Sequence, residues 1–75
     1  MDMYLVIAKH TMNDSVMFLA ANSLTQARKE LPRYSDSTGY MTLWKSRWAT
    51  KEDVKKYPKE FAMAKLKGFE FKGVK

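Results

Sequence analysis

Residues 3–21 read MYLVIAKHTMNDSVMFLAA, and this stretch decides the first part of the fold. Two apolar runs, Met3–Ala8 and Val16–Ala21, flank a polar segment that contains the turn pair Asn13-Asp14. Two β-rich runs joined by about five or six polar residues predict a β-hairpin. The first run hardly alternates between apolar and polar residues, which is typical of a strand covered on both faces.

Directly after the hairpin, the sequence predicts a helix with Ser23 as its N-cap. The Ser23 hydroxyl can accept hydrogen bonds from free backbone N–H groups, and Gln26 completes a capping box three residues later. Pro32 predicts the end of this helix, because proline biases its predecessor away from helical geometry. The apolar residues at helical spacing, which mark its buried face, are Leu24, Ala27 and Leu31.

Residues 40–48, YMTLWKSRW, predict a third strand because of their aromatic content. A period of two places the rings on one face and the cations on the other. A helix is the alternative, since Trp44 and Trp48 are also four residues apart, but we favour the strand. The rings of this segment are Tyr40, Trp44 and Trp48, and its cations are Lys45 and Arg47.

Thr50 predicts the start of a second helix. Glu52 and Asp53 then lie in its first turn, where carboxylates interact favourably with the helix dipole. Pro58 either breaks this helix or opens a further one over about residues 59–67. Gly68 is the expected left-handed C-terminal cap. Residues 69–72, FEFK, alternate and predict a short last strand at a sheet edge.

The order of these elements, β-β-α-β-α-(α)-β, predicts an α+β fold. We expect a small, mostly antiparallel sheet with the helices packed on one face. Seventy-five residues suffice for one domain and are too few for two, so we expect a single domain over residues 1–75. The loop-like residues 34–39 are then an internal connection.

The composition argues against several classes of function. The chain has no cysteine and a single histidine, His10, so we expect no metal site, no cofactor and no thiol catalysis. With three glycines there is no glycine-rich phosphate loop, and no pair of carboxylates has the setting of a catalytic dyad. The two apolar runs are too short to cross a membrane. We therefore expect a non-enzymatic, cytoplasmic protein.

The net charge of +6 comes entirely from the second half of the chain, because residues 39–75 hold ten basic and four acidic residues. Such a field favours the phosphate backbone of a nucleic acid, an anionic membrane or an acidic protein surface. Exposed rings could stack on bases while cations follow phosphates. The alternative is that the rings fill the core and the lysines form a solvated surface. The candidate binding residues are Tyr40, Trp44, Lys45, Arg47, Trp48, Lys51, Lys55 and Lys56.

The sequence favours a protein-binding module, an adaptor or inhibitor that uses an aromatic or basic face against an acidic partner. The size and the lack of any motif also fit the small accessory proteins that phages encode to bind host factors. A nucleic-acid-binding module is the alternative function. A homodimer is also possible on sequence grounds, because the residues Met3, Leu5, Met17 and Leu19 could exceed what one thin core needs.

Overall fold

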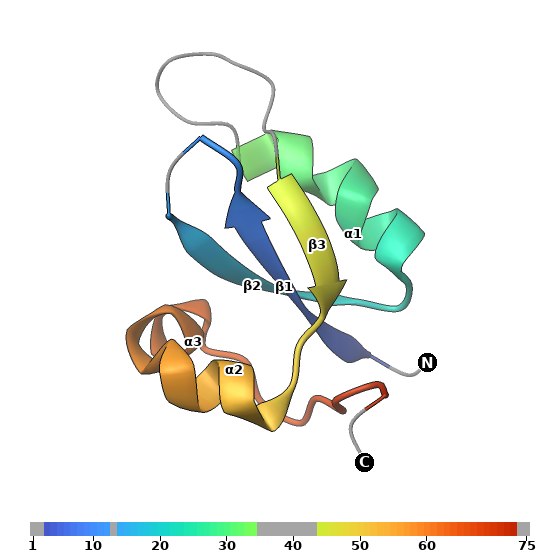
Figure 1. Cartoon of the computed structure of the whole chain (residues 1–75). Coiled ribbons are helices and arrows are strands. Elements are labelled where there is room, and N and C mark those ends of the chain that lie inside the picture. Colours follow the sequence, from blue (N-terminus) through green and yellow to red (C-terminus); the bar gives the residue numbers. More distant parts are fainter. Residues whose placement is uncertain (1–2, 13, 35–43, 74–75) are drawn as a thin grey trace.

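The computed structural model describes residues 3–12, 14–34 and 44–73 and confirms the α+β fold (Figure 1). The predicted hairpin is present, with strands close to the predicted bounds. In chain order the elements are β1 (Tyr4–His10), β2 (Val16–Ala21), α1 (Leu24–Glu30), the 3-10 helix η1 (Leu31–Tyr34), β3 (Trp44–Trp48), α2 (Lys51–Lys56) and α3 (Pro58–Ala64).

Within the described residues the three strands form one antiparallel sheet in the order β2-β1-β3. The central strand β1 pairs with β2 from Tyr4 opposite Ala21, and with β3 from Val6 opposite Trp48. The strand predicted over residues 40–48 is therefore observed over its second half. Residues 40–43, including the candidate Tyr40, lie outside the described part of the chain.

The predicted last strand at residues 69–72 was wrong, because only Glu70 joins the sheet. It forms a single parallel bridge with Tyr4. The Leu5 amide donates to the Glu70 carbonyl at 3.2 Å, and the Glu70 amide donates to the Met3 carbonyl at 3.3 Å. This place beside β1 is open because β3 ends at Trp48, and Ala49 makes the last bond of that ladder, to the Leu5 carbonyl at 2.8 Å.

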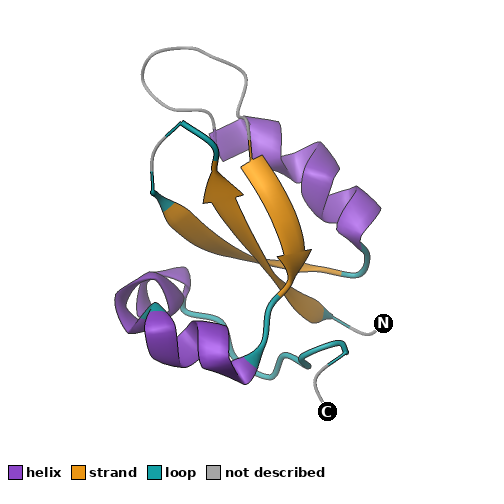
Figure 2. Ribbon diagram, viewed as in Figure 1, coloured by secondary structure: helices purple, strands orange, loops and turns teal. Residues whose placement is uncertain are grey.

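The helices cover both faces of the sheet, which corrects the expectation that they would pack on one face (Figure 2). Val6 and Ala8 of β1 belong to a buried cluster that includes Ala27 of α1. Leu5 and Ile7 face the other way, into a cluster covered by α2, α3 and the segment after them. Since successive side chains of a strand point to opposite faces, the unbroken apolar run of β1 needs cover on both.

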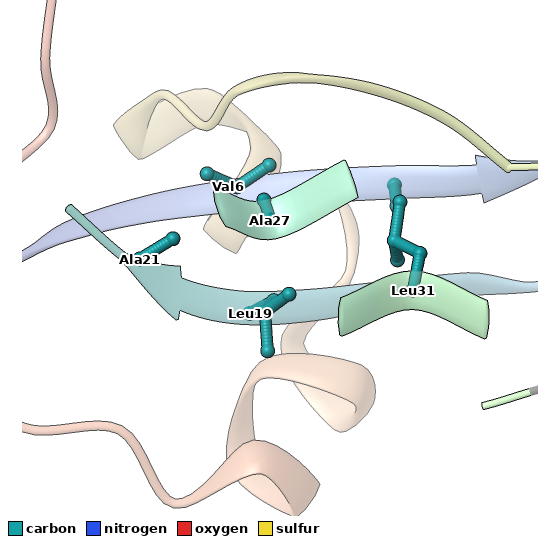
Figure 3. Packing of buried hydrophobic residues seen from close by; sticks show 6 residues of the cluster. Val6, Leu19, Ala21, Ala27 and Leu31 are labelled. Atoms are coloured by element: carbon teal, nitrogen blue, oxygen red, sulfur yellow. The ribbon is translucent and has the colours of Figure 1, made fainter. Parts of the chain in front are cut away.

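The cluster on the α1 side is built largely from small side chains, which let the helix lie close to the strands (Figure 3). Figure 3 shows Ala27 of α1 next to Val6 of β1, and Leu19 and Leu31 belong to the same buried cluster. Leu5 and Leu19, two of the residues considered for a dimer contact, are thus buried on opposite faces of the sheet.

The first helix begins as predicted, although its capping box is displaced by one residue. The Ser23 hydroxyl accepts a hydrogen bond from the Gln26 amide at 3.0 Å. The Gln26 side chain accepts from the amide of Asn22, at 2.8 Å, rather than from that of Ser23. Pro32 ends the α-helix but not the helical backbone, because Leu31 keeps right-handed helical angles and the chain continues as η1.

Pro58 separates two helices, which settles the choice that the sequence left open. It occupies the first turn of α3, where its missing N–H costs nothing. The C-terminal cap of α3 is Lys65, with φ of 52°, and not Gly68 as predicted. Gly68 has φ of 73° three residues later, in the turn that directs the chain back to β1.

Candidate basic surface on the sheet

Three cations project from the face of the sheet that also carries α2 and α3. Ile7 of β1 points into the cluster on that face, so Lys9, two residues further on, points the same way. The register then places Arg47 directly opposite Ile7 and Lys45 directly opposite Lys9. We call Lys9, Lys45 and Arg47 the basic triad.

An open hollow of about 240 Å³ lies among these cations. Its apolar side chains come from both strands of the hairpin and from the residue between α2 and α3, and the cations of the basic triad stand around them. A site with an apolar base and a few convergent charged groups suits a small anionic group attached to an apolar stem. The lining residues are Ile7, Lys9, Val16, Lys45, Ser46, Arg47 and Tyr57.

Arg47 is held in place by Asp53 of α2. Its two terminal nitrogens donate to the two carboxylate oxygens at 2.6 and 2.7 Å, in the bidentate geometry that fixes a guanidinium. Asp53 is 6% exposed and also accepts from the backbone amide of Thr50 at 2.8 Å, which completes the capping box of α2. The sequence predicted the carboxylate at this helix end but not its partner six residues earlier.

The charges of this pair stabilise each other. Burial acts to raise the pKa of Asp53, but the hydrogen bonds from Arg47 and Thr50 and the Arg47 charge outweigh burial, so this pKa is lowered. The pKa of Arg47 is raised, chiefly by its hydrogen bond to Asp53. Both groups are therefore charged at neutral pH, and the arginine side chain remains 62% exposed to solvent.

Lys9 and Lys45 are directly opposite each other, and among the described residues neither is held by a bidentate carboxylate as Arg47 is. Directly opposite side chains in a sheet have Cβ atoms about 5 Å apart, and like charges at this spacing destabilise the pair. Lys9 has one ion pair, to Asp14 at 3.7 Å, between two solvent-exposed side chains. Among the described residues no carboxylate lies within ion-pair distance of Lys45. Lys9 has no predictable role in the sequence pattern, because only the strand register brings it beside Lys45.

The predicted lysines of α2 extend the positive surface. Lys51, Lys55 and Lys56 are all exposed, as is Lys59 in the first turn of α3. The Lys56 ammonium lies 5.4 Å from the ring centre of Tyr57, whose side chain lines the hollow. Lys56 therefore contacts a residue that lines the hollow.

The two tryptophans lie on the opposite face of β3, packed against the cluster on the α1 side. Trp44 meets His10 edge to face at 4.9 Å. Trp48 meets Tyr4 edge to face at 5.4 Å, and the Lys72 ammonium lies 4.9 Å from a ring centre of Trp48. Trp44 and Trp48 therefore lie on the opposite face of the sheet from Lys45 and Arg47, the cations with which they alternate in the sequence.

His10 does not lie in a polar turn, as the sequence suggested, but is buried at the end of β1, where its Nδ1 accepts from the Met12 amide at 3.0 Å. Residues 3–12, 14–34 and 44–73 contain no group of three or more metal-binding side chains. No helix in these ranges has the length and apolar character needed to cross a bilayer.

Comparison with known proteins adds no functional information. No family model matches the sequence, and no curated protein or solved structure shows significant similarity to it. A functional proposal for this chain therefore rests on the arrangement of its own residues.

Proposed function

We propose that this chain is a small, non-catalytic module that binds an acidic segment of another protein through the basic triad. One observation carries the proposal: Lys9 and Lys45 stand directly opposite each other in the sheet. This arrangement costs stability in the free chain, and a bound carboxylate between the two ammonium groups would remove the repulsion. A pair of lysines with no purpose beyond solubility would be better placed apart.

The surroundings of the triad favour a protein segment over a nucleic acid. Apolar side chains from Ile7, Val16 and Tyr57 lie among the cations, and these suit the methylene groups of Asp or Glu and their apolar neighbours. Stacking on successive bases needs several rings beside the cations, whereas Tyr57 is the one ring among the residues that line the hollow. Trp44 and Trp48 are on the other face and contact His10 and Tyr4 instead.

A nucleic-acid phosphate backbone is the second candidate partner. The exposed lysines of α2 and of the first turn of α3 favour it, since a row of cations can follow a row of phosphates. We place either activity in the cytoplasm, as an accessory or inhibitory protein acting on a host or cellular factor, because the chain has no cysteine.

The test is a titration of the whole chain against a dye-labelled synthetic peptide of alternating glutamate and valine, with binding followed by the fluorescence anisotropy of the dye. A lysine–valine peptide of equal length and a single-stranded thymidine oligonucleotide, each carrying the same dye, are titrated separately for comparison. The glutamate peptide should bind, and its affinity should fall as salt is raised, because the contacts are charged. Tighter binding of the oligonucleotide at every salt concentration would instead support the second candidate.

A matched pair of variants identifies the surface. Lys45→Glu should weaken the glutamate peptide about tenfold, or roughly 1.4 kcal/mol, because it removes one attraction and adds one repulsion. Lys29→Glu makes the same charge change at an exposed position of α1 and should bind as the parent does. Equal losses in both variants would show that net charge alone drives the binding, and the proposal would then be wrong.

A further inference from the structure

The backbone of β3 has one side that no described strand covers. In the order β2-β1-β3, the third strand has a single neighbour. Ala49 donates to the Leu5 carbonyl, so odd-numbered residues of this segment bond to β1. The backbone groups of the even-numbered residues therefore point away from β1, and these residues are Trp44, Ser46 and Trp48.

The side chain of Arg47 agrees with this assignment. Its Nη1 donates to the Trp48 carbonyl at 3.1 Å, which is the direction expected of an acceptor on the open edge. An added strand could supply a backbone N–H to the same carbonyl while Asp53 continues to hold the guanidinium. The edge is thus partly satisfied in the free chain and available to a partner.

We propose that the acidic partner binds as an extended strand, antiparallel to β3 along this edge, with acidic and apolar residues in alternation. This inference rests on the proposed function and adds the conformation and the pattern of the partner. Side chains opposite Lys45 and Arg47 fall on the face of the basic triad, and charge complementarity requires Asp or Glu there. Side chains opposite Trp44 and Trp48 fall on the aromatic face and should be apolar.

The geometry of an antiparallel ladder strengthens this pattern. Residues opposite Lys45 and Arg47 occupy pairs without hydrogen bonds, in which side chains approach most closely. Residues opposite Trp44, Ser46 and Trp48 make the backbone bonds. The side chains of the partner's acidic residues therefore make the charge contacts, and the backbone groups of its apolar residues make the hydrogen bonds to β3. The two kinds of contact can be tested separately.

The other edge of the sheet does not offer this selectivity. β2 has six residues and no charged side chain. An apolar groove of about 480 Å³ runs beside it, and Met63, which lines the groove, is 80% exposed. Glu60 also lines this groove, and its carboxylate would repel an acidic strand, so we assign the partner to β3.

The experiment compares three forms of the alternating glutamate–valine peptide on the whole chain. One is unmodified, one carries N-methyl groups on alternate valines, and one carries them on alternate glutamates. The valine N–H groups point at β3 in the proposed arrangement, so N-methylvaline should weaken binding at least tenfold, while N-methylglutamate should leave it within about twofold. Amide exchange of Trp44, Ser46 and Trp48 should slow on binding of the unmodified peptide.

The outcomes separate this inference from the proposed function. One outcome is that the unmodified peptide binds in a Lys45-dependent way while both methylated forms bind as tightly as it does. In that case the proposed acidic partner is supported and the addition of a strand is wrong. If only the N-methylglutamate peptide loses affinity, the glutamate N–H groups point at β3, and the antiparallel arrangement is wrong. If the unmodified peptide does not bind, the proposed function and the inference both fail.

Discussion

The two faces of the sheet are covered to different extents, and the difference locates the candidate site. On the α1 side, small residues such as Ala8 and Ala27 bring the helix close, and the aromatic rings of Trp44 and Trp48 pack against that cluster. On the other side, α2, α3 and the segment after them bury larger side chains, but the end of the sheet near Lys9 and Lys45 remains exposed. Lys9 and Lys45 therefore lie on the part of this face that α2 and α3 do not cover.

This difference shows how one strand can serve stability and binding at once. The even-numbered side chains of β3 belong to the aromatic face, and Lys45 and Arg47 belong to the basic one. Substitutions on the two faces of the sheet should therefore differ in their effects on stability and on binding.

The largest effect is expected at Phe18, which is 4% exposed on the α2–α3 side and meets Phe61 edge to face at 5.7 Å. Phe18→Ala should lower the free energy of unfolding by about 3–5 kcal/mol, because it leaves a cavity in a thin core. Urea denaturation followed by circular dichroism measures this. Met12→Ala, at an exposed position, should change stability by no more than about 0.5 kcal/mol. If both variants unfold at the parent's midpoint, the proposed core on this face is wrong.

A smaller effect is expected at Asp53. Asp53→Asn keeps the shape of the side chain but removes the charge that holds Arg47 and weakens the cap of α2, so stability should fall by roughly 1–2 kcal/mol. The same denaturation curves measure it. Glu52→Gln, at an exposed position of the same helical turn, is the control and should cost little. Equal losses would mean that any negative charge near this helix end suffices.

Stability should also depend on pH through Asp53. Because the pKa of this carboxyl is lower in the folded chain than its usual value, its ionised form stabilises the fold. The contribution is complete above the unfolded pKa, about 4, and is lost as the pH falls through the folded value. Thermal melts between neutral pH and pH 3 should show a steeper fall for the parent than for Asp53→Asn. Parallel curves would show that other carboxylates cause the acid sensitivity.

The smallest effect on stability is expected at Lys45, where stability and binding should change in opposite directions. Lys45→Glu places a carboxylate opposite Lys9, so we expect it to raise the free energy of unfolding by about 0.5 kcal/mol while it weakens binding of the acidic peptide. A residue retained at a cost to stability is characteristic of a functional site. Paired denaturation and binding measurements on the same preparation test this. A variant that is less stable than the parent would remove the main support for the basic triad.

Several local features were predictable because short-range chemistry fixes them. The hairpin follows from two β-rich runs around a polar turn, and the helix starts at Ser23 and Thr50 follow from side chains that accept backbone N–H groups. The errors arose where a distant segment decides the outcome. Residues 69–72 alternate like a strand, but only Glu70 reaches an open position beside β1.

The candidate site shows the same division. Lys45 and Arg47 were identified from the sequence, and their separation from the rings follows from the period of a strand. Lys9 and Tyr57 were missed, because they join the site only through strand register and the turn between two helices. The sequence accounts for Asp53 through its place in the first turn of α2, but not for its contact with Arg47, which lies on β3.

By itself the sequence determined the α+β class, the hairpin, the first helix, the cap of the second and the excess of positive charge in the second half. These depend on backbone preferences and on neighbours a few residues apart. Only the tertiary structure decided the order β2-β1-β3, the cover on both faces and the opposition of Lys9 to Lys45. The physical reason is that strand pairing joins residues far apart in the chain, and no local preference encodes whether the third strand pairs with β1 or with β2.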